Sequence, residues 1–319
     1  MSLSTPSNKT NLQGKRVLSV GLSCIDQLWR VDQFPPVQSR THASAYRMQG
    51  GGAAATGAAT IAQLGMGVEL WTVHGEDANG HYAKQELESL GVTCDHIKIP
   101  EDSITFVSCI LVTPDGERYI FPYRGENLTD DTAGLDVGDL SRFDCVLTDA
   151  RFPVINEHVL QAASAQNIPI VGDFGNTKNW HLARYVTHLI ASEECAADVL
   201  GHNDPEAALD ALRQFDGQLV GITLGEQGFL YKLGDKVRHI PALPVEVVDT
   251  NGAGDVFHGA YAYAVAMGWD DEACGLFASV TAALSCKQLG SRTGIPPAQD
   301  IEKLLQERTS KEIDEMQWV

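Results

Sequence analysis

The sequence predicts an α/β protein with a doubly wound, mostly parallel β-sheet, helices on both faces and a small β-strand lid. The first observation behind this prediction is that short apolar segments, typical of buried strands, alternate with helix-like segments along most of the chain. The second is that two stretches, about residues 28–49 and 105–123, alternate in strand fashion without an intervening helix. The third is size, because 319 residues of which 44% are hydrophobic can bury one large core.

The elements follow from these patterns in chain order. Residues 1–14 start with a polar segment and are expected to form a loose tail, and 15–319 a single domain. Strands are expected at 17–21, 68–73, 145–148, 168–172, 188–191 and 219–223. Helices are expected at 53–64, 80–90, 155–166, 205–215 and 256–267. We interpret 28–49 and 105–123 as segments of one lid, inserted over the edge of the sheet.

The charge and the cysteines limit the expected partners and compartment. Asp and Glu number 42 against 23 Lys and Arg, and the net charge of −19 repels nucleic acid and anionic membranes, so neither is an expected partner. Seven cysteines without a Cys-x-x-Cys pair indicate reduced thiols rather than disulfides or a zinc site. Since there is no long apolar run and no signal-like N-terminus, we expect a cytoplasmic protein.

Residues 247–260, VVDTNGAGDVFHGA, are the most informative segment, with a strand-like segment before and a helix-like one after. Gly252, Ala253 and Gly254 lack bulk, so ligand oxygens can approach their backbone N–H groups at a helix N-terminus, where the dipole favours negative charge. Asp255 follows in the first helical turn, where a base could take a proton from a hydroxyl that attacks a phosphoryl group. A glycine-rich turn in which Asp255 only caps the helix is the alternative.

Other nucleotide-binding motifs are absent from the sequence. There is no P-loop, no protein-kinase motif set and no Gly-x-Gly-x-x-Gly after a strand. Phosphoryl transfer without a P-loop still needs positioning, Mg²⁺ and charge neutralisation. The N–H groups of residues 252–255 can neutralise charge, and Mg²⁺ would be held mainly by ATP phosphates and waters.

The string DTNGAGD at 249–255 resembles the signature of the ribokinase-like (PfkB) sugar kinases. Further segments are similar to motifs of that family: GLSCID at 21–26 to its first strand, GGAAAT at 51–56 to its sugar-site motif, and TLGEQG at 223–228 to its nucleotide-side turn. The similarity extends from about residue 16 to 296. The resemblance implies a ribokinase-like fold and an ATP-dependent kinase that transfers the γ-phosphoryl group to a primary hydroxyl of a sugar.

The resemblance also implies roles for individual residues. On the sugar side it implies binding by Asp26, Gly51, Gly52 and Thr56. On the ATP side it implies binding by Thr223, Gly225, Gly228, Ser192 and Glu193. Asp255 would be the general base, with the amides of Gly252, Ala253 and Gly254 as an anion hole. Asp249 resembles a position near a monovalent cation, which makes K⁺ a candidate cofactor beside ATP and Mg²⁺; bracing of the turn is the alternative role of Asp249.

The sequence departs from the family at the metal and sugar sites. Ser192 and Cys195 stand where the family has the Asn and Glu of an Asn-x-x-Glu motif, so Glu193 or Glu194 is the candidate substitute and the Mg²⁺ ligands stay open. Thr56 replaces an Asn of the sugar-site motif. Together with the runs at 149–151 and 290–296, these departures are most similar to sulfofructose kinases.

Two arginines indicate an anionic substrate. Arg40 lies in the first lid segment and Arg151 follows a core strand, and both fall where sulfofructose kinases carry positive charge near the substrate. Guanidinium groups suit sulfonate, phosphate and carboxylate oxygens, so we expect a ketose-type sugar bearing a sulfonate or phosphate. Surface ion pairs are the alternative role for both. Pro122 stands where sulfofructose kinases have an amide side chain, and proline cannot donate a hydrogen bond. The neighbouring Tyr123 and Arg124 could compensate for the missing donor.

Other roles and functions stay open at this point. Asp149 and Asp173 also follow strand-like segments, where a turn-forming or capping role competes with a functional one. His258, one helical turn past Asp255, could face the substrate, but helix packing or solvent exposure is the simpler expectation. The rival functions are a kinase for a neutral sugar or nucleoside and a non-catalytic sugar- or nucleotide-binding regulator. Because lids in this family often pair between subunits, a homodimer through the lid is also expected.

Overall fold

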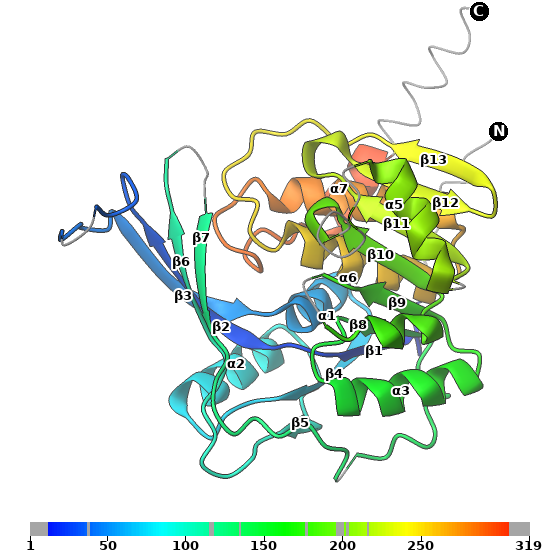
Figure 1. Cartoon of the computed structure of the whole chain (residues 1–319), viewed down its shortest axis with the longest axis horizontal. Helices are drawn as coiled ribbons and strands as arrows, with labels where there is room; N and C mark the ends of the chain where they lie inside the picture. Colours follow the sequence, from blue (N-terminus) through cyan, green and yellow to red (C-terminus); the bar gives the residue numbers. More distant parts are fainter. Residues whose placement is uncertain are drawn as a thin grey trace, which may run out of the picture.

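Two β-sheets form the framework of this computed structural model (Figure 1). The structure describes residues 12–36, 39–114, 118–133, 135–175, 178–195, 201, 204–215 and 217–305. Within these residues a nine-stranded sheet has the order β13–β12–β11–β10–β9–β8–β1–β4–β5, and a four-stranded sheet has the order β3–β2–β6–β7. Most of the expected tail, residues 1–11, lies outside the described residues, and the single domain over 15–319 stays a prediction.

The bounds of the elements are as follows. The large sheet contains β1 (Arg16–Val20), β4 (Gly67–Val73), β5 (Ile97–Lys98), β8 (Cys145–Thr148), β9 (Ile170–Asp173), β10 (His188–Ser192), β11 (Leu219–Thr223), β12 (Phe229–Leu233) and β13 (Lys236–Ile240). The small sheet contains β2 (Cys24–Arg30), β3 (Ala45–Gly51), β6 (Val107–Val112) and β7 (Arg118–Tyr123). The helices are α1 (Ala53–Gln63), α2 (Ala78–Ser89), α3 (Pro153–Ala165), α5 (Pro205–Leu212), α6 (Ala253–Ala266) and α7 (Asp271–Ser285).

The central strands of the large sheet are parallel, as expected. β1 pairs in parallel with β4 and β8, and the series continues in parallel through β9, β10 and β11. Only β12 and β13 are antiparallel among the described strands of this sheet, and they form a terminal hairpin that was not expected. β13 is exposed along most of its length, so its sequence lacks the apolar run that marks a buried strand.

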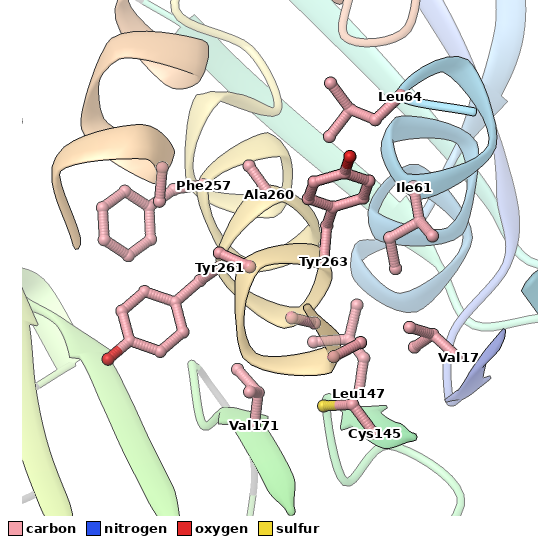
Figure 2. Close-up of a cluster of buried hydrophobic side chains, with 14 of the residues drawn as sticks. Val17, Ile61, Leu64, Cys145, Leu147, Val171, Phe257, Ala260, Tyr261 and Tyr263 are labelled. Atoms are coloured by element: carbon pink, nitrogen blue, oxygen red, sulfur yellow. The ribbon is translucent and has the colours of Figure 1, made fainter. Parts of the chain in front are cut away.

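Helices cover both faces of the sheet, which explains why its strands read as continuous apolar runs. Val17 of β1 belongs to a core with α1, α6 and α7, whereas its neighbour Leu18 belongs to a second core with α3 and α5. Figure 2 shows the first core, in which Tyr261 of α6 points toward the strands and Phe257 lies beside the neighbouring orange helix. Each fully buried side chain of this size stabilises the fold by about 1.5–3 kcal/mol, so this burial fixes α6 on the sheet.

α1 and α6 approach each other closely because both carry glycine where they cross. A Cβ at Gly259 would lie 2.8 Å from the Cα of Gly57, closer than real side chains come. The expected small-residue helix at 53–64 is confirmed, and its composition allows this contact. The close packing brings the N-termini of α1 and α6 to the same edge of the sheet (Figure 1).

The expected lid is confirmed as the small sheet, at the left of Figure 1, but its first strand starts earlier than expected. β2 begins at Cys24, so Asp26 lies within the lid and does not end the first strand of the core. The physical reason is that Gly21 has a φ of +148°, which ends β1 and turns the chain. β7 exposes apolar side chains, and pairing of lids between two copies stays a prediction.

A strand was predicted directly before the signature string at 249–255, and this prediction is wrong. Val247 and Val248 are 57% and 53% exposed and belong to no strand. Instead, the N–H groups of Val248 and Asp249 donate to the carbonyl of Cys286 at the end of α7, so a loop-to-helix contact replaces strand pairing. α6 starts at Ala253, three residues before the expected helix start at 256, and the following helix α7 was not expected.

Candidate active site

A cavity of about 210 Å³ opens where the carboxyl ends of the central strands meet the N-termini of α1 and α6. Ligands of open α/β sheets bind at this edge. The residues that line it are Ala53, Asp149, Arg151, Asp173, Gly175, Ser192, Thr223, Gly254, Asp255 and His258. The structure therefore brings together Arg151, Ser192, Thr223, Gly254 and Asp255, which the sequence singled out from distant segments.

The turn before α6 presents unpartnered N–H groups to this cavity. Gly252 has a φ of +74° and occupies the N-cap position without a side-chain cap. In the described part of the chain, the N–H groups of Gly254 and Asp255 have no hydrogen-bond partner, and Gly254 is exposed. Free N–H groups and the positive end of the helix dipole favour an anion here. The N–H of Ala253 instead donates to the Thr250 carbonyl at 3.3 Å, and the anion hole at residues 252–254 stays a prediction.

Asp249 braces the turn from behind. Its Oδ1 accepts from the N–H of Asn251 at 2.8 Å, and its Oδ2 accepts from the N–H of Gly290 at 2.8 Å. The side chain is buried. These bonds agree with the bracing role, and the role of Asp249 near a monovalent cation stays a prediction. Ser291, next to Gly290, packs so closely on Gly252 that an added Cβ at residue 252 would overlap the Ser291 Cβ.

Asp255 lies in the first turn of α6 with other carboxylates close by. Its pKa is raised well above the ordinary Asp value, first by burial and then by the negative charges of Asp173, Asp26 and Asp149. The positive charge of Arg292 opposes this shift. A raised pKa makes the Asp255 carboxylate a stronger base for a hydroxyl proton.

Asp173 and His258 also line the cavity. The Nδ1 of His258 lies 3.5 Å from the Oδ2 of Asp173 and 2.8 Å from the carbonyl oxygen of Gly254. Its Nε2 lies 3.3 Å from the carbonyl oxygen of Ile190. His258 is buried, so the packing interpretation holds, and the ring also ties α6 to β9 and β10.

Asp149 joins three segments at the rim of the cavity. Its Oδ2 accepts from the N–H groups of Leu22 at 2.8 Å and Ala54 at 3.2 Å, and its Oδ1 accepts from the N–H of Arg151 at 3.0 Å. The side chain is only 2% exposed, and burial raises its pKa to about 6, opposed by the Arg151 charge and by these hydrogen bonds. This arrangement supports the turn-forming role.

The turn at 149–151 directs Arg151 into the cavity. Ala150 has a φ of +54°, which is uncommon for a residue with a Cβ. Its N–H donates to Thr148 Oγ1 at 3.1 Å, and its carbonyl accepts from Asn179 Nδ2 at 2.7 Å. These bonds hold a strained conformation, and such strain is often retained at ligand sites.

The expected sugar-side residues fall in different places. Asp26 is buried against the Gly51 backbone, where an added Cβ would overlap its carboxylate, and burial raises its pKa. Gly52, with a φ of +92°, precedes α1. Thr56 is wholly buried and its hydroxyl has no partner among the described atoms, so it does not line the cavity. Arg40 is exposed between β2 and β3 and does not line it either.

The expected ATP-side residues lie along the other rim. Thr223 ends β11 and Ser192 ends β10, and both line the cavity. Gly225 and Gly228 follow in a tight turn in which the N–H of Gly228 donates to the Gly225 carbonyl at 3.1 Å. Glu193 is exposed and lies outside the cavity lining.

Cys195 cannot take the place of a carboxylate in the cavity. Its thiol is buried and lies 3.0 Å from the carbonyl oxygen of Phe174 and 3.1 Å from that of Gly175. Glu194, the other candidate substitute, is exposed. Asp173, for which the sequence left both a turn-forming and a functional role open, does line the cavity.

Residues 15–298 match the pfkB family carbohydrate kinase model. The chain belongs to this family. It is 28% identical over 297 residues to the ribokinase of Bacillus subtilis, covering 91% of this chain and 99% of that protein. It is 29% identical over 302 residues to the ATP-dependent ribose-1-phosphate kinase of Halopiger xanaduensis, covering 92% and 99%.

Solved structures agree with this assignment. A candidate ribokinase from Agrobacterium tumefaciens superposes with a TM-score of 0.88 at 29% identity, over 93% of this chain and 99% of that one. The ribokinase of Thermotoga maritima gives 0.78 at 26% identity, over 92% and 99%. The expected ribokinase-like fold and the expected ATP-dependent sugar kinase activity are thus confirmed at the level of the family. None of the helices in the described part of the kinase has the length and apolar character to cross a membrane.

Kinases of this family use ATP and Mg²⁺. Among the described residues, no group of three or more His, Cys, Asp or Glu side chains is arranged to hold a metal. Asp173 and Ser192 nevertheless offer oxygen atoms in the cavity, the ligand type that Mg²⁺ prefers. This agrees with Mg²⁺ held mainly by ATP phosphates and waters.

The raised pKa of Asp149 predicts a pH-dependent stability. Folded Asp149 keeps its proton up to about pH 6, whereas an unfolded Asp releases it near pH 3.8. Its contribution to the free energy of unfolding is therefore complete below pH 3.8 and lost as the pH rises through 6, a loss of about 3 kcal/mol. Urea unfolding of the parent and of Asp149→Asn should show the difference between them falling by that amount from pH 4 to pH 7.

The exposed Asp95→Asn serves as the control for this measurement, since it changes the net charge equally without touching the cavity. A parent-minus-variant difference that stays constant with pH would show that Asp149 titrates as an ordinary surface carboxyl.

Proposed function

We propose that this kinase transfers the γ-phosphoryl group of ATP to a primary hydroxyl of a ketose-type sugar that carries a sulfonate or phosphate. The observation that carries the proposal is that Asp255, Arg151 and the start of α6, where N–H groups are unpartnered, all line one cavity. A base, an anion hole and a fixed cation in one cavity suit phosphoryl transfer to an acceptor that is itself anionic.

The transfer needs few groups of the protein. The sugar hydroxyl oxygen bonds to the γ-phosphorus, the bond to the bridging oxygen of ADP breaks, and Asp255 takes the hydroxyl proton. The free N–H groups of Gly254 and Asp255 stabilise negative charge on the transferring group. The proposed contribution of Gly252 and Ala253 requires the Ala253 N–H to leave the Thr250 carbonyl. The oxygens of Asp173 and Ser192, which line the cavity, would help ATP to hold Mg²⁺, and the bound ion would supply further charge neutralisation. Thr223, which lines the cavity, and the turn at Gly225 and Gly228 that follows it bind ATP in this proposal.

Residues on the lid side align the sugar in this proposal. In this proposal Asp26 and the Gly51–Gly52 turn, whose carboxylate and backbone lie against each other, orient the sugar hydroxyl groups. Alignment of two reactants accounts for about 7–11 kcal/mol of a barrier in favourable cases. Because burial raises the pKa of Asp26, its carboxyl group holds a proton more readily. This favours hydrogen bonds that the carboxyl group can exchange with sugar hydroxyls over a fixed ion pair. For Thr56 to bind the sugar, a movement must expose its hydroxyl. For Arg40 to bind the anionic group of the substrate, the lid must fold inward.

Arg151 favours an anionic acceptor over a neutral one. A neutral sugar needs only hydroxyl partners, whereas a guanidinium in the cavity of a protein with a net charge of −19 provides a local site for an anion. One of the relatives is named for a phosphorylated sugar, ribose 1-phosphate. Ribokinase and deoxyribokinase are also among the relatives, so a neutral sugar is the second candidate.

The remaining alternatives have less support. A nucleoside kinase of Methanothermobacter thermautotrophicus is 24% identical, but a nucleoside site would not need Arg151. A non-catalytic regulator would not need both Asp255 and unpartnered N–H groups in one cavity. We further propose a homodimer formed through the lid, because β7 exposes Tyr119, Ile120, Phe121 and Tyr123. K⁺ bound near Asp249 remains part of the proposal.

Loss of the base should slow the chemical step. Asp255→Asn should bind ATP as the parent does but lower kcat by about 10²–10⁴-fold, the range for a positioned general base. Turnover with saturating ATP and sugar, together with an ATP titration by calorimetry, separates the two effects. If kcat stays within a few-fold of the parent, another group removes the proton.

Loss of Arg151 should act on anionic sugars alone. Arg151→Ala should reduce kcat/KM for fructose 6-phosphate or 6-deoxy-6-sulfofructose by about 1.5–3 kcal/mol in transition-state free energy, the range for hydrogen bonds to charged groups, and leave D-fructose nearly unchanged. Arg184→Ala, which removes an exposed ion pair with Glu157, is the control. An equal loss on both kinds of sugar would make Arg151 a structural residue.

A further inference from the structure

An ion pair between a buried arginine and a partly exposed glutamate lies between the lid and the core, away from the lining of the cavity. Arg292, in the loop after α7, is only 4% exposed. Its Nη1 donates to Glu86 Oε2 of α2 at 2.6 Å, and its Nη2 donates to the carbonyl of Gly51 in β3 at 2.8 Å. One side chain thus joins three segments that are far apart in the sequence, and one of its contacts is the turn assigned to the sugar.

The sequence makes room for this pair. An added Cβ at Gly50 would overlap both Arg292 Nη1 and Glu86 Oε2, so the guanidinium lies directly on the backbone of β3. Burying a charge costs several kcal/mol unless its partners are well placed. A buried arginine that uses two of its nitrogens on Gly51 and Glu86 therefore constrains the position of β3 strongly.

The loop that carries Arg292 also touches the anion hole. On its lid side, Arg47 Nη1 donates to the Leu289 carbonyl at 2.5 Å and Gln49 Nε2 donates to Ser291 Oγ at 3.1 Å. On its core side, the Gly290 N–H holds Asp249, and Ser291 packs on Gly252. The loop at 289–293 is therefore a spacer between the sugar-side strand and the phosphate-side turn.

We propose that Arg292 is a positioning residue that holds β3, and with it the sugar turn at Gly51, at a fixed distance from the anion hole of α6. The assignment of the two subsites rests on the proposed function. The charge of Arg292 also lowers the pKa of Asp26 against the effect of burial, which agrees with a place beside the sugar. Arg292 acts through β3 and not on the reacting atoms.

The first test needs no substrate. In Arg292→Met, hydrogen exchange of the β3 and α2 amides should be faster than in the parent by tenfold or more, whereas α3, in the opposite core, should be unchanged. Gly50→Ala keeps both charges but displaces them, so it should give the same pattern. Arg292→Lys, which keeps the charge with a single nitrogen, should be intermediate. Arg184→Gln, in an exposed pair, is the control.

The second test separates positioning from general damage. With fructose 6-phosphate or D-fructose as acceptor, Arg292→Met should raise the sugar KM by tenfold or more and leave the ATP KM within twofold, because the backbone bonds that brace the anion hole remain. If Arg292→Met is insoluble, Gly50→Ala and Arg292→Lys carry both tests. Equal changes in the sugar and ATP KM values would overturn the proposal.

The two tests distinguish failure of this proposal from failure of the proposed function. Unchanged exchange in β3 would overturn the positioning role whatever the substrate is. Faster exchange in β3 without turnover of any ketose would support the positioning role and contradict the ketose assignment.

Discussion

The structure depends on the conformation of the turn that starts α6. A left-handed Gly252 starts the helix without a side-chain cap, so N–H groups that a cap would have satisfied face the cavity. Such a turn holds only because Asp249 receives two backbone N–H groups and Ser291 packs on Gly252. α6 itself is fixed by burial against the sheet, α1 and α7.

The cavity combines this anion site with several carboxylates. The free N–H groups attract a phosphate, whereas ionised carboxylates repel it. Asp255, Asp149 and Asp173 would repel a phosphate if all were ionised and unopposed. The free N–H groups, Arg151 and Arg292 oppose that repulsion, and burial together with mutual repulsion raises the pKa of Asp255. The same crowding that weakens anion binding thus strengthens the base, which is a physical reason to collect acidic groups at a phosphoryl-transfer site.

The sequence predicted the parts of the fold that depend on local pattern. Strands buried on both faces and the small-residue helix α1 have clear signals, and so does the glycine-rich turn beside Asp255. Contacts between distant segments had no such signal. Val247 and Val248 have the sequence of a strand, but the N–H of Val248 donates to the carbonyl at the end of α7. Asp26 lies in the lid and not in the first core strand because Gly21 ends that strand and turns the chain. Arg292 lay within a noted run, yet only the structure shows it buried against Gly51.

The most direct test of the account is the acceptor preference of the parent protein. Phosphoryl transfer from ATP in the presence of Mg²⁺ should be followed for D-fructose, fructose 6-phosphate, 6-deoxy-6-sulfofructose and adenosine under the same conditions. The account predicts that kcat/KM for at least one anionic ketose exceeds that for D-fructose by tenfold or more. A preference for D-fructose or adenosine would contradict it.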